Sequence, residues 1–285
     1  MKIMDKEILS DVHGVRILRM DIHAPLLASK ASPGQFIAVM AVEQGERIPL
    51  TVVDSDAKKG VITIILQEVG LTTKLLGRLN PGDSLYSMVG PLGYPTEIKN
   101  YGQVVLVGGG VGIAEIYPVA KALKKAGNKV ITIIGARSKE LLILEKELKA
   151  VSGELHVTTD DGSYARKGFV TDVLKDVIAK CDNVGTEQCS VPTALVYAVG
   201  PIPMMKAVSS VTKPAGIKTL VSLNALMVDA TGMCGCCRVT IGNETKFSCV
   251  DGPDFDAHLV DWDELTKRSR IYIDKEKHIC NLNKL

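Results

Sequence analysis

The chain has 285 residues, of which 46% are hydrophobic and 23% are charged, so it is long enough for two or three globular domains. Its formal net charge of +2 is too balanced to indicate nucleic acid as the main partner. No apolar stretch is long enough to span a bilayer, and the first residues lack the apolar core of a signal peptide. These features argue against nucleic-acid and membrane partners and predict a cytoplasmic protein.

The first part of the chain carries short alternating runs separated by Gly, Pro and Asp, at 15–20, 35–40, 50–53 and 61–66. This pattern predicts an antiparallel barrel or sandwich over residues 1–98. Two segments beside these runs, 47–51 and 70–73, offer Arg and Thr side chains that suit a phosphate-bearing ligand. An edge strand protected by Pro and a helix cap are the simpler explanations of the same residues.

The middle part alternates between apolar runs and helical patterns. Strands are predicted at 103–108, 130–134 and 193–200, and helices at 116–126, 139–151 and 204–211. Strands that alternate with helices predict a parallel sheet covered on both faces.

The first strand of this sheet runs into Gly108-Gly-Gly-Val-Gly112. Glycines here let the backbone approach a pyrophosphate, and the following helix N-terminus favours its negative charge. The strict G-x-G-x-x-G spacing is not met, because Ile113 occupies the last position, so a packing turn is an alternative. The place of the loop after the first strand favours dinucleotide binding. Gly200-Pro201 forms a second loop at the same carboxyl edge, where an ordinary turn is again an alternative.

The C-terminal part contains the spacing D-x4-C-x2-C-x11-C, formed by Asp229, Cys234, Cys237 and Cys249. With Cys in place of Asp this would be the run that holds a [2Fe–2S] cluster in plant-type ferredoxins. Glycines on both sides of Cys234 give the loop the freedom to deliver several ligands. Residues 238–249 predict a hairpin that ends at the fourth ligand.

Other interpretations of the cysteines stay open. Zinc is an alternative to iron, although zinc prefers paired C-x2-C knuckles and only one such pair is present. Cys236 is an alternative fourth ligand if Asp229 is only a turn residue. The remaining Cys181, Cys189 and Cys280 are expected to be ordinary buried thiols. Seven Cys in this arrangement argue against a disulfide framework.

Together these three parts resemble the ferredoxin reductase superfamily over essentially the whole chain. The resemblance is strongest to the electron-transfer subunit of dihydroorotate dehydrogenase and to the small subunit of NADH-dependent reduced ferredoxin:NADP oxidoreductase. Asp229 in the first cluster position is similar to the second branch. The resemblance implies an antiparallel FAD-binding β-barrel at 1–98, a parallel-sheet NAD(P)-binding α/β domain at 99–220 and a small [2Fe–2S] domain at 221–285.

The resemblance also implies residue roles. The cofactor-binding residues it indicates are Pro49, Leu50, Thr51, Leu66, Gln67, Gly70, Thr72 and Thr73 for FAD, and Gly109, Gly110, Gly112, Arg137, Gly200 and Pro201 for the nicotinamide nucleotide. The chain departs from the family pattern at three places: Ile48 replaces an Arg, Glu115 replaces a Pro, and Gly200 follows Val199 where the family has Cys.

The implied function is electron transfer from NADH through FAD to the [2Fe–2S] cluster and on to a larger iron–sulfur flavoprotein subunit. Through that partner, the complex would link NADH, NADPH and ferredoxin by flavin-based electron bifurcation. No catalytic side chain is expected, because positioning the cofactors is the work of the protein. NADH is preferred on the resemblance, although Arg137, Ser138 and Lys139 could receive a 2′-phosphate. The alternatives are the electron-transfer subunit of dihydroorotate dehydrogenase and a zinc-stabilised nucleotide-binding regulator.

Overall fold

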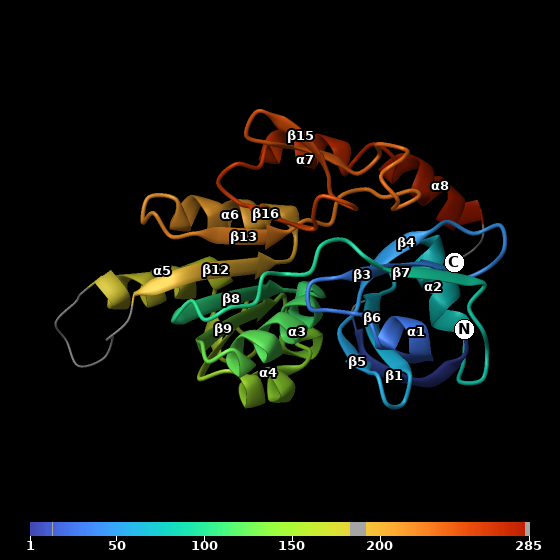
Figure 1. Ribbon diagram of the computed structural model, residues 1–285, viewed down its shortest axis with the longest axis horizontal. Helices are drawn as coiled ribbons and strands as arrows, with labels where there is room; N and C mark the ends of the chain where they lie inside the picture. Colours follow the sequence, from blue (N-terminus) through green and yellow to red (C-terminus); the bar gives the residue numbers. More distant parts are fainter. Residues whose placement is uncertain (13, 183–191, 283–285) are drawn as a thin grey trace. The chain divides into compact units, whose positions relative to one another are not determined.

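The computed structural model describes residues 1–12, 14–182 and 192–282 (Figure 1). The chain forms two compact units. Unit 1 comprises Met1–Pro95, Asn224–Pro253 and Asp261–Leu285, and unit 2 comprises Thr96–Leu223 and Asp254–Val260. The chain passes from unit 1 to unit 2 after Pro95 and back after Leu223, close to the expected domain boundaries after residues 98 and 220. The division into three domains stays a prediction.

The N-terminal part of unit 1 consists of two antiparallel sheets, as the alternating runs predicted. One sheet has the order β1 (Ile3–Val12), β2 (Val15–His23), β6 (Val61–Gln67) and β5 (Asp54–Asp56). The other has the order β4 (Ile48–Thr51), β3 (Phe36–Met40) and β7 (Ser87–Leu92). Two helices, α1 (Pro25–Ala28) and α2 (Leu71–Arg78), accompany the sheets. The antiparallel barrel is therefore confirmed.

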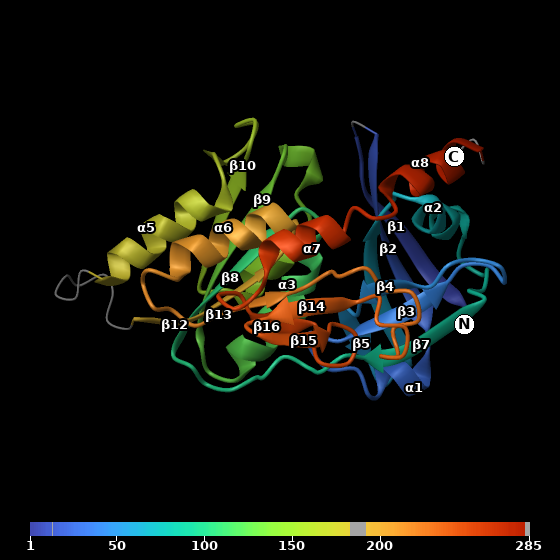
Figure 2. The same cartoon turned by 90° about the horizontal axis from the view of Figure 1, so that it is seen from above.

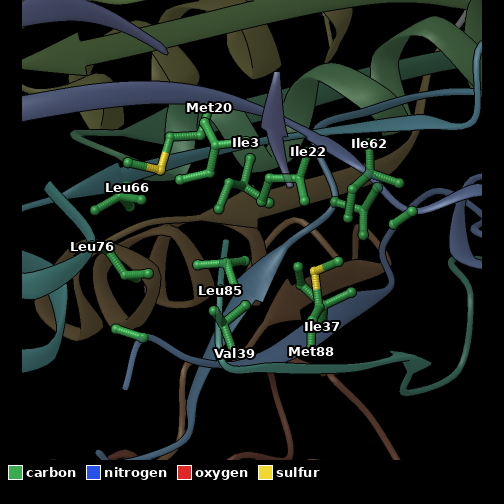
Figure 3. Packing of buried hydrophobic residues seen from close by; sticks show 14 of the residues in the cluster. Ile3, Met20, Ile22, Ile37, Val39, Ile62, Leu66, Leu76, Leu85 and Met88 are labelled. Carbon is green, nitrogen blue, oxygen red and sulfur yellow. The ribbon is translucent and has the colours of Figure 1, made fainter. Parts of the chain in front are cut away.

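The two sheets enclose one hydrophobic core (Figure 3). Met20 and Ile22 of β2 and Ile62 and Ile64 of β6 are fully buried, and Ile37 of β3 joins them. Because successive side chains of a strand point to opposite faces, the period of two places these residues on one side. Each such side chain contributes on the order of 1.5–3 kcal/mol by its burial, which makes this core a rigid support for the adjoining loops.

Unit 2 is built on a seven-stranded sheet that is parallel except at one edge. Its order is β11 (Arg166–Lys167), β10 (Glu154–Thr159), β9 (Lys129–Ala136), β8 (Gln103–Gly109), β12 (Thr193–Val199), β13 (Thr219–Ser222) and β16 (Asp254–Asp256). Helices α3 (Gly112–Lys125) and α4 (Glu145–Val151) pack together on one face, and α5 (Val170–Asp182) and α6 (Ile202–Thr212) pack together on the other (Figure 1). Every residue of β8 is buried, as its continuous apolar run predicted.

Two helix predictions were wrong in their limits. Helix α3 begins at Gly112 and not at residue 116, because the glycine-rich turn itself forms the first helical turn. A single helix was predicted over 139–151, but the structure has a 3₁₀ turn at Lys139–Leu141 followed by α4. Leu144 separates them with φ of 54°, a left-handed conformation that interrupts the helix.

The C-terminal part of unit 1 contains the predicted hairpin, formed by β14 (Arg238–Ile241) and β15 (Glu244–Phe247). Gly242 has φ of 61° in the two-residue turn, which suits the twist of the strands. Two further helices follow, α7 (Trp262–Arg268) and α8 (Ile273–Leu282). Over the described residues, none of the helices is both long and apolar enough to cross a bilayer. The expectation of buried thiols at Cys181, Cys189 and Cys280 concerns side chains outside the described part.

The short strand β16 is held in the sheet by the side chain of the half-buried Asp254. Asp254 accepts hydrogen bonds from the Tyr197 hydroxyl at 3.0 Å and from Thr96 Oγ1 at 2.5 Å. Burial raises the pKa of Asp254 to about 6, and hydrogen bonds from Thr96, Tyr197 and Ser222 partly oppose this rise. Unit 2 consists of two chain segments, which begin at Thr96 and Asp254. The hydrogen bond between these two side chains therefore links the starts of both segments.

We expect the protein to lose stability, relative to the Asp254→Asn variant, as the pH rises from about 4 to about 6. The folded pKa of about 6 lies above the ordinary 3.8, so the folded state binds the proton more tightly than the unfolded state. The stability gained from protonation is complete below about pH 4 and is lost as the pH passes the folded pKa, on the order of 3 kcal/mol in all. Urea unfolding of both proteins between about pH 4 and 7 measures this difference. Parallel pH profiles would contradict it.

Candidate functional site

The loop between β13 and β14 is organised around Asp229. Its Oδ1 accepts a hydrogen bond from the Thr231 backbone N–H at 2.9 Å, and its Oδ2 accepts one from the Cys234 N–H at 3.1 Å. These bonds, that of Thr231 first, lower the pKa of Asp229. Positive φ angles at Gly232 (84°) and Gly235 (66°) let the loop turn on both sides of Cys234. The carboxylate and the first thiol of the motif therefore belong to one tight turn.

The other two predicted ligands meet at the open end of the hairpin. The Cys237 thiol donates to the Cys249 sulfur, with the two sulfurs 3.1 Å apart. Both residues are buried, with exposed fractions of 2% and 1%. The Ser248 N–H donates to the Cys237 carbonyl at 3.0 Å, which extends the hairpin ladder to this pair. Burial, followed by the Cys237 hydrogen bond, raises the pKa of the Cys249 thiol to about 12. The two cysteines form a preorganised dithiol.

The donor set fits a binuclear cluster. In the described part of the chain no three His, Cys, Asp or Glu side chains gather around one metal position. Each iron of a [2Fe–2S] cluster takes only two protein ligands, so two pairs are what such a cluster needs. Cys237 with Cys249 would supply one pair, and Asp229 with Cys234 would supply the other. All four cysteines of this region are free thiols.

Cys236 lies beside the set without entering either pair. Its backbone N–H donates to the Cys234 sulfur at 3.5 Å. Burial raises the pKa of its thiol, and the neighbouring Cys234 adds to that rise. Its alternative role as fourth ligand is untested by this geometry, and the ligand set stays a prediction.

The two predicted nucleotide loops of unit 2 lie against each other. A Cβ on Gly112 would lie 2.5 Å from the Val199 carbonyl oxygen and 2.9 Å from the Gly200 Cα. A Cβ on Gly200 would lie 3.1 Å from the Gly109 oxygen. Real Cβ atoms do not approach backbone as closely as 2.5 Å, so only glycine permits the contact at Gly112. The backbones of the two loops, 108–112 at the end of β8 and 199–201 at the end of β12, are thus in direct contact, and together they are called the joined loop edge.

The remaining residues of these loops support this edge. Gly110 has φ of 57° and donates its N–H to the Gly135 oxygen at 2.9 Å, with open space where a side chain would stand. Pro201 is the N-cap of α6, and its carbonyl accepts from the N–H groups of Met204 and Met205. Helix α3 begins without a side-chain cap, but the N–H groups of Ile113 and Ala114 donate to the Gly110 and Val111 oxygens, and Glu115 places an acid in the first turn.

Two acids that were not among the predicted site residues lie beside Arg137. The Asp161 N–H donates to the Arg137 oxygen at 3.2 Å, and the Asp160 N–H donates to the Ala136 oxygen at 3.1 Å. Burial raises the pKa of Asp160, and Arg137 opposes the rise. The signal was available, since both acids directly follow β10, but that half-exposed strand was not recognised.

The predicted flavin residues lie on three adjacent elements of the barrel. Pro49, Leu50 and Thr51 form the half-buried edge strand β4, which contacts β6. Gln67 ends β6, and Gly70 opens α2 with no atom within 4 Å of a would-be Cβ. Open space at a glycine before a helix N-terminus suits a pyrophosphate, so the residues present fit FAD.

Three of these residues have side chains that pack in the core or cap a helix. Leu66 is 1% exposed and belongs to the barrel core, and Thr72 is also buried. The Thr73 hydroxyl accepts from the Val69 and Gly70 N–H groups at 2.9 and 3.0 Å, so it caps α2 as the simpler explanation expected. The side chain of Leu66 is therefore not available to a ligand.

Comparisons with known proteins agree with this arrangement. Residues 224–261 match the iron–sulfur cluster binding domain of dihydroorotate dehydrogenase B, and residues 106–210 match the oxidoreductase NAD-binding domain. The electron-transfer subunit homolog of dihydroorotate dehydrogenase B from Thermotoga maritima is 48% identical, over 90% of this chain and 87% of its own. The electron-transfer subunit from Bacillus caldolyticus is 35% identical, over 85% and 91%. A chain in the structure of an NADH-dependent reduced ferredoxin–NADP oxidoreductase, described for flavin-based electron bifurcation, has 43% identity and a TM-score of 0.86 over 97% of this chain and 95% of that one.

The barrel, the nucleotide sheet and the thiol-bearing loop define an oxidoreductase subunit with a ferredoxin-reductase-like fold, which works with NAD(H), FAD and an iron–sulfur cluster. The chain belongs to the family of dihydroorotate dehydrogenase B electron-transfer subunits. Membership of a family of subunits implies a larger partner subunit. The expected fold class, cofactors and redox function are confirmed, and the matched iron–sulfur domain favours iron over zinc.

Proposed function

We propose that this chain carries electrons from NADH through FAD and a [2Fe–2S] cluster to a larger iron–sulfur flavoprotein subunit, within an electron-bifurcating NADH-dependent reduced ferredoxin:NADP oxidoreductase. The buried Cys237–Cys249 pair, inside the segment matched as an iron–sulfur domain, carries the proposal. The likeness to the bifurcating oxidoreductase, at 43% identity over 97% of the chain, supports this complex and the involvement of ferredoxin and NADPH through the partner. Bound FAD would take two electrons from NADH and release them one at a time.

The protein residues would each act where the structure places them. Cys237 and Cys249 would hold one iron, and Asp229 and Cys234 the other. Gly109, Gly110, Gly112, Gly200 and Pro201 would hold the pyrophosphate and nicotinamide along the joined loop edge. Pro49, Leu50, Thr51, Gln67 and Gly70 would face the flavin, with Leu66 supporting them from the barrel core and Thr72 and Thr73 shaping the start of α2.

The surface next to the cluster loop supports transfer to a partner. Met233 is 88% exposed, Val228 51% and Val250 39%, and all three lie within a few residues of proposed ligands. Contiguous exposed apolar surface marks protein–protein contact sites, and these three side chains would contribute to one. The Cys234 end of the cluster site is exposed as well. Electrons would leave at this face.

NADH is expected to reduce the flavin at least about tenfold faster than NADPH. Asp160 and Asp161 follow β10 and bond to the end of β9, at the edge where the adenosine ribose of a dinucleotide binds, and Asp160 offsets part of the charge of Arg137. A 2′-phosphate would bring about two further negative charges to this edge. Stopped-flow absorbance with each nucleotide measures both rates. Flavin that NADH does not bleach would contradict the proposed function, and equal rates would contradict the preference.

The Asp229→Cys variant is expected to have a lower cluster midpoint potential, by tens of millivolts in order of magnitude. A thiolate donates more electron density to iron than a carboxylate does and so stabilises the oxidised cluster. A redox titration followed by electron paramagnetic resonance compares the two proteins. An unchanged midpoint would remove Asp229 from the ligand set.

A further inference from the structure

Helix α7 is fixed to the hairpin that carries two of the proposed ligands (Figure 2). Asp261, its N-cap, donates its backbone N–H to the Thr240 oxygen of β14 at 2.9 Å. The Asp261 carboxylate also accepts from two backbone N–H groups of the first helical turn. Trp262 and Leu265 are buried, with exposed fractions of 9% and 3%. The helix therefore has a defined position relative to the cluster loop.

The last residue of α7 reaches this loop. Arg268 donates from Nη2 to the Cys236 carbonyl oxygen at 2.8 Å, and the contact is partly buried. Arginine in a last helical turn commonly compensates the negative end of its own helix. Here the guanidinium bonds to a segment 32 residues earlier in the chain, between the proposed ligands Cys234 and Cys237.

Two physical effects follow from this contact. Reduction adds one negative charge to the cluster, so a nearby cation stabilises the reduced state more than the oxidised state. The same bond restrains the Cys236 backbone, whose N–H donates to the Cys234 sulfur at 3.5 Å. Hydrogen bonds to ligand sulfurs tune cluster potentials, and they do so most when their geometry is held. Both effects favour the reduced cluster.

We propose that Arg268 is a positioning residue that holds the Cys236 backbone against the cluster and raises the midpoint potential of the cluster. This inference rests on the proposed cluster ligation. It extends the redox site to a helix outside the cysteine motif, at a residue that ligates no iron. Arg238 is a weaker contributor, since its Nη1 lies 3.4 Å from the Gly235 oxygen and the residue is exposed.

The experiment compares Arg268→Gln, Arg268→Lys and the control Arg270→Gln in the full chain, reconstituted anaerobically with iron, sulfide and FAD. Arg270 is an exposed residue two positions further on, so its substitution removes the same charge. Cluster reduction is titrated by electron paramagnetic resonance. In Arg268→Gln the ratio of reduced to oxidised cluster at a fixed potential should fall about tenfold, which is about 59 mV for one electron. Arg268→Lys keeps the charge but loses the planar guanidinium and its fixed donor geometry. The ratio of reduced to oxidised cluster should therefore fall only about threefold. The control should match the wild type.

An unchanged midpoint in an iron-loaded Arg268→Gln protein would overturn the proposal, as would an equal shift in Arg270→Gln. If only Arg268→Gln loses iron, the midpoint potential of Arg268→Lys is the test. A midpoint lowered by the amount that corresponds to about threefold supports the proposal, and an unchanged midpoint overturns it. Loss of iron from both Arg268 variants would show that Arg268 is needed to keep the loop folded, and this result would also overturn the proposal. A wild-type protein that takes up no iron would instead contradict the proposed cluster.

Discussion

The Cys249→Ser variant is expected to retain FAD and to lose its iron almost completely, by about tenfold or more. Cys249 and Cys237 are buried with their sulfurs 3.1 Å apart, so they would serve the same iron. With one thiol removed, that iron keeps a single protein ligand, and a cluster depends on its full set. A serine hydroxyl is a harder and less acidic donor than a thiol and does not replace it. Iron and flavin analysis after anaerobic reconstitution measures the loss.

Cys236→Ser is the matched control for this experiment. It removes a thiol from the same loop, but one that belongs to neither pair. Iron content equal to that of the wild type is expected. Full iron in Cys249→Ser would contradict the ligand assignment. Iron loss in Cys236→Ser, with Asp229→Ala retaining iron, would make Cys236 the fourth ligand instead of Asp229.

Reduction of the flavin by NADH is expected to slow by about 100-fold in the Gly112→Ala variant, with iron and flavin contents unchanged. The added methyl group would lie 2.5 Å from the Val199 oxygen and 2.9 Å from the Gly200 Cα, and both are backbone atoms. Backbone cannot swing aside as a flexible side chain can, so the two loops must move apart. Their displacement would misplace the nicotinamide, and misplacement by about 1 Å costs two orders of magnitude in rate.

Gly153→Ala is a suitable control for the loop variant. Gly153 lies in the same unit, and a methyl group there would meet only the Val130 oxygen at 3.4 Å, an ordinary contact. Stopped-flow bleaching by NADH should be unaffected in this control. A rate in Gly112→Ala equal to that of the wild type would show that the joined loop edge does not position the nucleotide.

The sequence predicted those elements whose pattern reflects burial. Strand β8 is buried at every position, so its apolar run was unambiguous, and the cysteine spacing predicted a pair that the structure brings together. The break at Leu144 was not predictable, because neither Gly nor Pro marks it and packing imposes its left-handed angle. Strand β16 was missed for a similar reason, since three residues carry no periodicity and Asp254 holds them through side-chain bonds.

The candidate site divides in the same way. Motif spacing identified Cys237 and Cys249 and the glycine loops, because each depends on residues close in the chain. Contacts between distant segments cannot be identified from motif spacing and need the neighbouring strands or helices to be recognised first. Arg268 meets Cys236 across 32 residues, and Asp161 lies beside Arg137 only because two strands are neighbours in the sheet. Leu66 was proposed from a motif and also lies in the barrel core, so a motif position can at the same time be a core position.

The most direct test is an anaerobic addition of NADH to the purified, reconstituted protein, with iron, zinc and flavin determined on the same sample. The protein is expected to hold about two irons and one FAD per chain and no zinc, to show bleaching of the flavin absorbance, and to give a rhombic electron paramagnetic resonance signal upon reduction. Protein that holds neither iron nor flavin after reconstitution, or that binds zinc in the cysteine loop, would contradict this expectation.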